Sequence, residues 1–250
     1  MRRLLPDPGP TTVADQYSHL RLVARARPDR PYLVTNFALT VDGRAQVDGR
    51  SGPIGDRTDS EVLHRLRTQV DAVMIGAGTL RVERYGRIVP DPALRGFRER
   101  REGLAPDPLA VVVSDSLELP WDAPLFTCGY GRVLIVTSSA AEIPDTATSV
   151  RVDRHLGAID LRRALATLGA ERGVRAVLCE GGPHLHASLV RGGLVDEMFV
   201  TRAPKLALNE GLGLLADGFG DRGPAGLELV WLLEADGELF ARYLVADSGS

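Results

Sequence analysis

The stretch VRAVLCEGGPHLHASLV, residues 174 to 190, passes from an apolar run through two adjacent glycines into a proline-led segment with the pattern of a helix. The apolar run has the density of a buried strand, and proline is favoured in the first turn of a helix. A second stretch, VMIGAGTL at residues 73 to 80, likewise leads from an apolar strand through small residues into a candidate helix. Strand, tight turn and helix in succession build sheets of parallel strands, so the two stretches predict an α/β fold.

The same alternation continues along the rest of the chain. Strands are expected within four further apolar runs, at residues 31–43, 109–114, 132–138 and 149–152. The amphipathic segment 56–70 has Thr58 and Glu61 at the spacing of a capping box, which predicts a helix that starts near Asp59. A second amphipathic segment, 160–173, ends on a glycine and predicts another helix.

The C-terminal part of the chain has a different pattern. Residues 227–246 form two strand-like runs around Asp236 and Gly237, a pair typical of a tight antiparallel hairpin. We therefore expect a mostly parallel central sheet flanked by helices, ending in this hairpin. The loops rich in proline and glycine are too short to separate domains, so we expect one domain over residues 31–250 after an N-terminal extension, residues 1–30.

The composition narrows the classes of function. With 30 basic and 33 acidic residues among 250, the formal net charge is -3, which gives no basic field for nucleic acid. No apolar stretch reaches the length of a membrane span, and prolines interrupt the opening segment, so the predicted compartment is the cytoplasm. Cys128 and Cys179 are the only cysteines and imply no disulfide framework.

The two glycine turns are candidates for binding a nucleotide. Ligands of open α/β sheets bind at the carboxyl ends of the strands, where backbone N–H groups free of side chains suit a phosphate. The run Gly76-Ala77-Gly78 lacks the third glycine of the Rossmann fingerprint, because position 81 is Arg81. Close packing would explain either turn by itself equally well. The two turns together favour nucleotide binding.

Three segments of the chain resemble a known family. NFALTVDGRA, HRLRTQVDAVMIGAGT and VLCEGGPHLHASLVRGGLVDEMFVTRAPKL are similar, in this order, to motifs of the reductase domain of bacterial riboflavin-biosynthesis deaminase/reductases. That domain has the dihydrofolate-reductase-like fold, and the similarity spans about residues 31 to 206. The resemblance implies an NADPH-dependent oxidoreductase that forms a homodimer.

The resemblance also implies where NADPH binds. The expected cofactor contacts come from the two glycine turns and are Gly76, Ala77, Gly78, Thr79, Glu180, Gly181 and Gly182. Ser114, at the end of the third apolar run, is a further candidate for contact with the adenosine ribose or its 2′-phosphate. The alternative for Ser114 is an ordinary hydrogen bond at the end of a strand.

Members of the family reduce the ribose of a phosphoribosylamino-pyrimidine, but this chain departs from the family around the substrate. It has Asn36 where the family usually has lysine, and Glu83 begins a Glu-Arg-Tyr stretch where the family has Asp-Asn-Pro. Asn36 and Glu83 are therefore candidate substrate contacts. Arg67 is another, because a guanidinium group matches phosphate oxygens, although it could equally lie on a solvated helix face.

Two carboxylates are candidate catalytic groups. Asp42 lies in an Asp-Gly turn after the first strand, where it could orient the substrate or guide a proton, and Asp59 lies on the following helix. Turn formation and the helix dipole would explain these residues as well. The substrate stays open between a pyrimidine and a pterin such as dihydrofolate, and a nucleotide-binding protein without turnover is the alternative from another class.

No metal site is expected. His184 and His186 point in different directions on a helix, and Cys179 beside them is explained by the apolar run. The zinc signature of the family's deaminase half, His-x-Glu with Pro-Cys-x-x-Cys, does not occur in the sequence. The sequence therefore predicts a stand-alone reductase without zinc.

Overall fold

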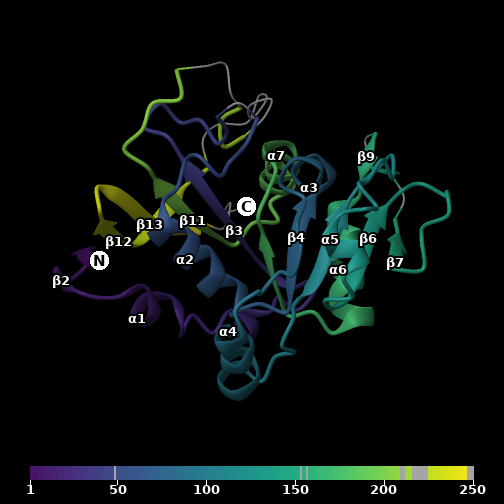
Figure 1. Cartoon of the computed structure of the whole chain (residues 1–250), viewed down its shortest axis with the longest axis horizontal. Coiled ribbons are helices and arrows are strands. Elements are labelled where there is room, and N and C mark those ends of the chain that lie inside the picture. Colours follow the sequence, from purple (N-terminus) through teal and green to yellow (C-terminus); the bar gives the residue numbers. More distant parts are fainter. Residues whose placement is uncertain (48, 153, 156, 209–211, 216–224, 247–250) are drawn as a thin grey trace. The chain divides into compact units, whose positions relative to one another are not determined.

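The computed structural model describes residues 1–47, 49–152, 154–155, 157–208, 212–215 and 225–246 (Figure 1). The chain divides into two compact units. The first unit contains residues 1–20, 33–66 and 183–250, and the second contains residues 21–32 and 67–182. The predicted N-terminal extension is thus divided between the units, and a single domain over residues 31–250 stays a prediction.

The first unit contains a series of paired strands. Its strands lie in the order β2 (Gly9–Pro10), β1 (Arg2–Leu5), β12 (Leu227–Ala235), β13 (Glu238–Val245), β11 (Glu197–Arg202) and β3 (Tyr32–Leu39). Strands β3 and β11 are parallel, and the other neighbours in this series are antiparallel. The helices of this unit are α1 (Val13–Tyr17), α2 (Arg57–Arg67) and α7 (Pro183–Arg191).

The C-terminal hairpin predicted from the sequence is confirmed. Strands β12 and β13 pair antiparallel, with Ala235 opposite Glu238. The two residues between them, Asp236 and Gly237, have φ values of 51° and 84°. Positive φ at both positions is what a two-residue hairpin of matching twist requires, and glycine and aspartate tolerate it.

The strands of the main sheet in the second unit are all parallel. They lie in the order β10 (Ala176–Cys179), β4 (Ala72–Gly76), β5 (Leu109–Val113), β6 (Val133–Thr137) and β7 (Thr148–Arg151). Each neighbouring pair is parallel. Residues such as Val73, Val111 and Ile135 are completely buried, which explains why these strands have apolar residues at consecutive positions.

Helices and short elements complete the second unit. The helices are α3 (Ala77–Glu83), α4 (Pro92–Phe97), α5 (Pro124–Thr127) and α6 (Leu161–Arg172), with a 3₁₀ turn at Leu22–Arg25, a π turn at Arg98–Glu102 and the two-residue strands β8 (Arg154–His155) and β9 (Ala158–Ile159). Helix α6 starts after Asp160, whose side chain accepts a hydrogen bond from the N–H of Arg163, and it ends at Gly173, as predicted. Helix α3 leaves directly from the carboxyl end of β4 (Figure 1).

The helix predicted to start near Asp59 is present as α2, and it begins two residues earlier, at Arg57. The Oδ1 atom of Asp56 accepts hydrogen bonds from the N–H groups of Thr58 at 2.7 Å and Asp59 at 3.1 Å. Asp56 therefore caps the helix, because an aspartate before the first turn competes effectively with the Thr58 capping box.

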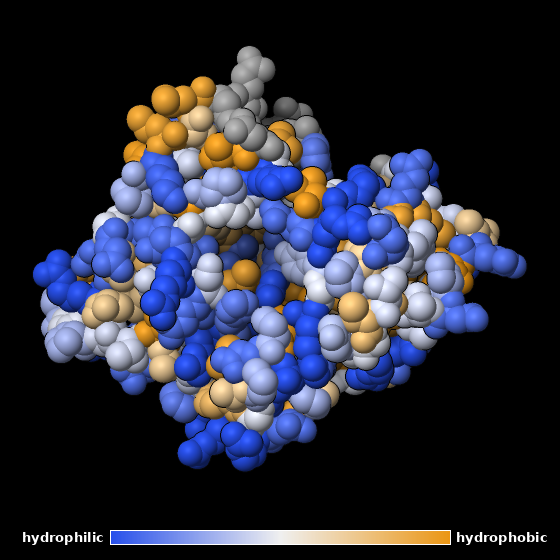
Figure 2. All heavy atoms as spheres, in the orientation of Figure 1, coloured by the Kyte–Doolittle hydropathy of each residue, from blue (hydrophilic) through white to orange (hydrophobic). Residues whose placement is uncertain are grey.

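Hydrophilic residues cover most of the face seen in Figure 2, in keeping with a sequence in which 25% of the residues are charged. Among the described residues, the helices are all too short or too polar to traverse a lipid bilayer.

Candidate functional site

The two glycine turns meet at the carboxyl edge of the second unit's sheet. Strands β10 and β4 are neighbours, with Cys179 opposite Met74. Beyond this pair, the N–H of Gly76 donates a hydrogen bond to the carbonyl oxygen of Gly181 at 2.7 Å. The structure thus brings the seven cofactor candidates of the two turns into one cluster.

The protein itself requires glycine at two positions of this cluster. Gly181 has φ of 113°, a value that other residues rarely adopt. A Cβ atom on Gly182 would lie 2.8 Å from Oγ1 of Thr79, so the two turns pack against each other too closely for a side chain. Both glycines are explained by the fold before any ligand is considered.

Gly78 is different, because the protein leaves room for a side chain there. The atom nearest to a Cβ built on Gly78 is Nη2 of Arg81, at 4.0 Å, and the backbone of Gly78 does not have the positive φ that favours glycine. Alanine would also stabilise helix α3 at this position by about 1 kcal/mol. The fold therefore gives no reason for glycine at position 78, whereas a ligand lying against this backbone would.

A buried ion pair anchors the turn Glu180-Gly181-Gly182, which we call the EGG turn. The carboxylate of Glu180 accepts hydrogen bonds from Nε and Nη2 of Arg67, both at 2.7 Å, and from the hydroxyl of Tyr85 at 3.1 Å. The side chains of Arg67 and Glu180 are 9% and 3% exposed. The third donor group of Arg67, Nη1, bonds to the carbonyl oxygen of Ile88 at 2.8 Å. We call Arg67, Glu180 and Tyr85 the Arg67 clamp.

Electrostatics keep the clamp charged and hydrogen-bonded. Burial by itself would lower the pKa of Arg67, but the adjoining Glu180 carboxylate raises it above its usual value. Burial and the Glu180 charge raise the pKa of Tyr85 well above its usual value, so that the phenol stays protonated and donates to Glu180. The side chain of Glu180 thus bonds to Arg67 and Tyr85, and the backbone of Glu180 continues into the turn.

The clamp bears on two predictions from the sequence. Binding of a substrate phosphate by Arg67 stays a prediction, and it would require guanidinium nitrogens that already bond to Glu180 and Ile88. Glu83 lies at the end of α3, two residues before Tyr85, and its contact with substrate also stays a prediction. The sequence singled out Tyr85 only as a departure from the family and missed its contact with Glu180.

Ser114 makes the strand-end hydrogen bonds given as the alternative. Its N–H donates to Val136 at 3.0 Å, and its side-chain oxygen accepts from the N–H of Leu117 at 3.1 Å. The residue is buried. Contact between Ser114 and a ribose stays a prediction.

In the first unit, Asn36 offers a buried oxygen that the protein does not use. Asn36 lies in β3, and its Oδ1 atom is buried without a hydrogen-bond partner among the described residues. The same holds for Oγ1 of its neighbour Thr35. An unsatisfied buried polar atom costs about 1–3 kcal/mol, so each of these atoms calls for an explanation. Successive residues of a strand point to opposite faces, so a single ligand does not explain both.

Asp42 lies in the turn that the sequence predicted. The N–H of Gly43 donates to the carbonyl oxygen of Thr40 at 2.9 Å, and Gly43 has φ of 82°. The exposed carboxylate of Asp42 accepts from the N–H of Ala207 at 3.1 Å. Hydrogen bonds from Thr40 and Ala207 lower the pKa of Asp42, so its side chain is ionised at neutral pH.

Asp59 belongs to a group of three carboxyl side chains, with Asp56 and Glu238, that we call the acidic cluster. Burial raises the pKa of Asp59, and its Oδ1 atom has no partner in the described part of the chain. Glu238 comes from the hairpin and is 2% exposed. Burial and the neighbouring Asp56 carboxyl raise its pKa to about 8. The sequence pointed to Asp59 but missed Glu238, because the hairpin that brings it there is distant in the chain.

The raised pKa of Glu238 predicts a loss of stability in mild alkali. The folded chain keeps a proton on Glu238 that the unfolded chain releases above its usual pKa. This contribution is complete below pH 4.5 and is lost as the pH rises towards about 8. Between pH 6.5 and 8 we expect the free energy of unfolding to fall by about 1.5 kcal/mol, at roughly 1.4 kcal/mol per pKa unit.

Urea unfolding at several pH values measures this loss, with Glu238→Gln as the comparison. Glutamine cannot ionise, so the variant is expected to lack this part of the pH dependence and to be the more stable protein at pH 8. Equal slopes in the two proteins would show that Glu238 does not carry the effect.

The histidines and cysteine near α7 do not assemble a metal site in the described residues, where no group of three candidate ligands occurs. Burial raises the pKa of Cys179 to about 12, which keeps its thiol protonated. His186 is buried and stacked on Phe37, with ring centroids 4.4 Å apart, and its Nδ1 atom lies 3.1 Å from the carbonyl oxygen of Leu214. The absence of zinc from the protein stays a prediction.

Comparison with known proteins identifies relatives of the chain. A family model described as the RibD C-terminal domain matches residues 31–213. A 2,5-diamino-6-ribosylamino-4(3H)-pyrimidinone 5′-phosphate reductase of Methanothermobacter thermautotrophicus is 32% identical over 203 residues, which cover 76% of this chain and 86% of the relative. The protein of the same name in Archaeoglobus fulgidus is 30% identical over 180 residues, covering 70% and 81%.

Other relatives are longer than this chain. The riboflavin biosynthesis protein RibD of Escherichia coli is 27% identical, and the match covers 76% of this chain but 53% of that protein. This chain therefore spans about half the length of such relatives.

Solved structures agree with the predicted fold class. A pyrimidine reductase-like protein from Corynebacterium diphtheriae superimposes with a TM-score of 0.79 at 25% identity, covering 95% of this chain and 100% of that one. The deaminase/reductase of Thermotoga maritima, at 23% identity and a TM-score of 0.71, covers 87% of this chain and 57% of that one and supports the fold alone. Reductases of this family use a nicotinamide cofactor. The chain belongs to the RibD C-terminal domain family, whose named members in these comparisons are reductases of riboflavin biosynthesis.

Proposed function

We propose that this protein is an NADPH-dependent reductase that converts the ribosyl group of a phosphoribosylamino-pyrimidine to a ribityl group in riboflavin biosynthesis. The observation that carries the proposal is the cluster of two glycine turns joined by the bond from Gly76 to Gly181, at the sheet edge where α/β proteins bind nucleotides. The names of the relatives supply the reaction.

The residues of the second unit fit a bound dinucleotide. The backbone from Gly76 to Thr79 and at Gly181 and Gly182 would lie against the diphosphate, and the open space over Gly78 would admit it. When bound, NADPH supplies the hydride. The protein aligns the reactants and excludes water, and the Arg67 clamp holds the turn in place for this.

The residues of the first unit fit proton transfer and orientation. Of the two predicted catalytic carboxyls, Asp59 has the raised pKa of a group that can hold and deliver a proton. Asp42 is ionised and can accept a hydrogen bond from a sugar hydroxyl. The unused oxygen of Asn36 can do the same for a donor group of the substrate.

Two pyrimidine substrates are candidates, and they differ by one deamination. The relatives with the higher identity, which this chain nearly spans, are named for the 2,5-diamino-pyrimidinone. The Thermotoga maritima protein is named for the 5-amino-uracil and carries a deaminase half as well. The higher identity of the first group favours the diamino-pyrimidinone for this chain. A cytoplasmic homodimer remains part of the proposal, on the strength of the family resemblance.

The direct test is the decrease of NADPH absorbance with each pyrimidine and with dihydrofolate. We expect turnover of the pyrimidines, fastest for the diamino-pyrimidinone. Turnover of dihydrofolate alone would favour the pterin alternative, and NADPH binding without any turnover would favour the nucleotide-binding alternative.

Asn36→Ala tests the substrate contact in the same assay. Because Oδ1 of Asn36 has no protein partner in the described residues, the variant loses no hydrogen bond within the protein from this atom. We expect kcat/KM to fall by about tenfold, the value of one hydrogen bond to a substrate. Thr35→Val is the matched control, since Thr35 has an equally unused buried oxygen on the other face of β3. An equal loss of kcat/KM in both variants would contradict the assignment.

A further inference from the structure

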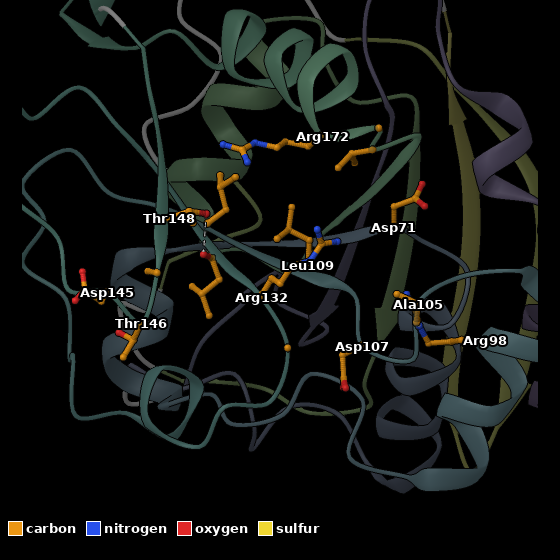
Figure 3. A pocket seen from close by; sticks show the side chains of 16 residues that line it. Asp71, Arg98, Ala105, Asp107, Leu109, Arg132, Asp145, Thr146, Thr148 and Arg172 are labelled. Carbon is orange, nitrogen blue, oxygen red and sulfur yellow. Dashed lines mark hydrogen bonds between the residues drawn. The ribbon is translucent and has the colours of Figure 1, made fainter.

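A cavity of about 470 Å³ lies at the amino-terminal edge of the second unit's sheet (Figure 3). Its lining includes Asp71 directly before β4, Leu109 at the start of β5, Arg132 directly before β6 and Ala147 directly before β7. The glycine turns follow the last residues of β4 and β10, at the opposite edge. A strand of five residues spans about 16 Å, so the cavity is separate from the proposed cofactor site.

The cavity has an apolar floor. Leu109, Val133, Leu134 and Val174 line it and are almost completely buried. The volume falls within the range of about 300–1,000 Å³ that is usual for small-molecule sites. An organic group of moderate size therefore fits the space and can contact carbon atoms at its base.

Two of the three carboxylates that line the cavity are already neutralised. Asp71 accepts hydrogen bonds from Nη2 of Arg175 at 3.0 Å and from the N–H of the same residue at 2.8 Å. Asp107 pairs with both Nε and Nη2 of Arg87, at 2.9 and 2.6 Å. The third carboxylate, Asp145, is exposed at the rim.

Three arginines line the same cavity. Arg98 is completely buried and donates from Nε to Ala105 at 2.8 Å and from Nη1 to Val70 at 2.9 Å. Burial lowers the pKa of Arg98 to about 10, so it stays charged at neutral pH. Arg132 and Arg172 are exposed, and their guanidinium groups form no ion pair with the described residues.

The two exposed arginines of the cavity face one carboxylate that has no ion pair with the described residues. The lining itself has three arginines and three aspartates, but Asp71 and Asp107 are paired with Arg175 and Arg87, which leaves the exposed Arg132 and Arg172 against Asp145. A phosphate monoester carries a charge of about -1.5 to -2 at neutral pH, and guanidinium groups match its oxygens with paired hydrogen bonds. The hydroxyl of Thr146 on the rim provides a further donor.

We propose that this cavity is a binding site for a small organic phosphate, with the phosphate held by Arg132 and Arg172 and the organic part on the apolar floor. The site is independent of the proposed reduction, because it lies at the other edge of the sheet. Nothing in its binding requires NADPH or substrate.

Calorimetric titration with phenyl phosphate tests the site, because this probe combines a phosphate with an apolar ring. We expect saturable binding of one molecule per chain, with benzoate binding at least about fivefold more weakly because it carries half the charge. Arg132→Gln and Arg172→Gln should each weaken binding by about fivefold, and the double variant by more than tenfold. Arg163→Gln, on the exposed face of the helix that carries Arg172, is the matched control and should change nothing.

Asp145→Asn adds a test whose expected result is a gain in affinity, which damage to the fold would not produce. Removing the exposed carboxylate at the rim should tighten binding of phenyl phosphate by about twofold. The proposal is overturned if wild-type protein shows no saturable binding, if the double arginine variant binds as wild type does, or if benzoate binds as well as phenyl phosphate. Repeating the titration with NADPH present should leave the affinity unchanged, and competition would place the probe at the glycine turns and overturn the proposal.

Discussion

Glu180→Ala is expected to lower the free energy of unfolding by about 3–5 kcal/mol, enough to remove a large part of the stability of a typical domain. The variant leaves the guanidinium group of Arg67 buried, without the carboxylate that bonds to its Nε and Nη2 atoms. Tyr85 loses the acceptor of its hydroxyl as well. Urea unfolding of the protein without cofactor measures the change, so that any effect on ligand binding stays out of the result.

A double-mutant cycle assigns the loss to the pair. Arg67→Ala should cost a similar amount, and the double variant should cost clearly less than the sum of the two single changes. The exposed pair Arg84 and Asp122 is the matched control, because its side chains are 48% and 77% exposed. Arg84→Ala should cost less than about 1 kcal/mol. A loss at Glu180 no larger than the loss at Arg84 would show that the Arg67 clamp does not hold the fold.

Gly78→Val is expected to weaken NADPH binding by at least about a hundredfold, and Gly78→Ala by about tenfold, which corresponds to roughly 2.7 and 1.4 kcal/mol. The protein has space for a Cβ atom at this position, since the nearest atom to it lies 4.0 Å away. The added atoms would therefore occupy the space that the proposed cofactor needs. Fluorescence or calorimetric titration with NADPH measures the affinity.

Thermal unfolding without cofactor must accompany these titrations. Gly78→Ala should be as stable as the wild type or more so, because alanine favours the helix. Gly9→Val is the matched control, since a Cβ there also meets open space and its φ is not positive. NADPH affinity that is unchanged in a folded Gly78→Val protein would remove this residue from the cofactor site.

The fold could be predicted because its strands, turns and helices are indicated by residues that are close together in the sequence. Each apolar run followed by a turn and a helix indicates a parallel strand, and carboxyl ends of such strands share one edge, which is why the turns at Gly76 and Gly181 could be expected to meet. Asp236 and Gly237 likewise predicted the hairpin. Helix α2 begins two residues earlier than predicted because two possible N-caps, Asp56 and Thr58, lie close together there. The side chain of Asp56 makes the capping hydrogen bonds.

The candidate site was less predictable because its key contacts are not local. Arg67 and Glu180 are separated by 113 positions, and no periodicity or spacing tells which buried arginine a glutamate will meet. Glu238 joins Asp56 only through the register of the hairpin against β11. The sequence indicated which residue types can do chemistry, whereas their protonation and their partners required the packed structure.

The anchoring of the EGG turn has a consequence for the kinetics and thermodynamics of ligand capture. Ordering a flexible loop costs about 1–2 kcal/mol of backbone entropy per residue, which a ligand must offset from its own interactions. Here the Arg67 clamp and the bond between Gly76 and Gly181 restrain the turn in the free protein. For the proposed dinucleotide, a preorganised turn of this kind would remove the need for a slow loop-ordering phase and would leave more of the interaction energy as affinity.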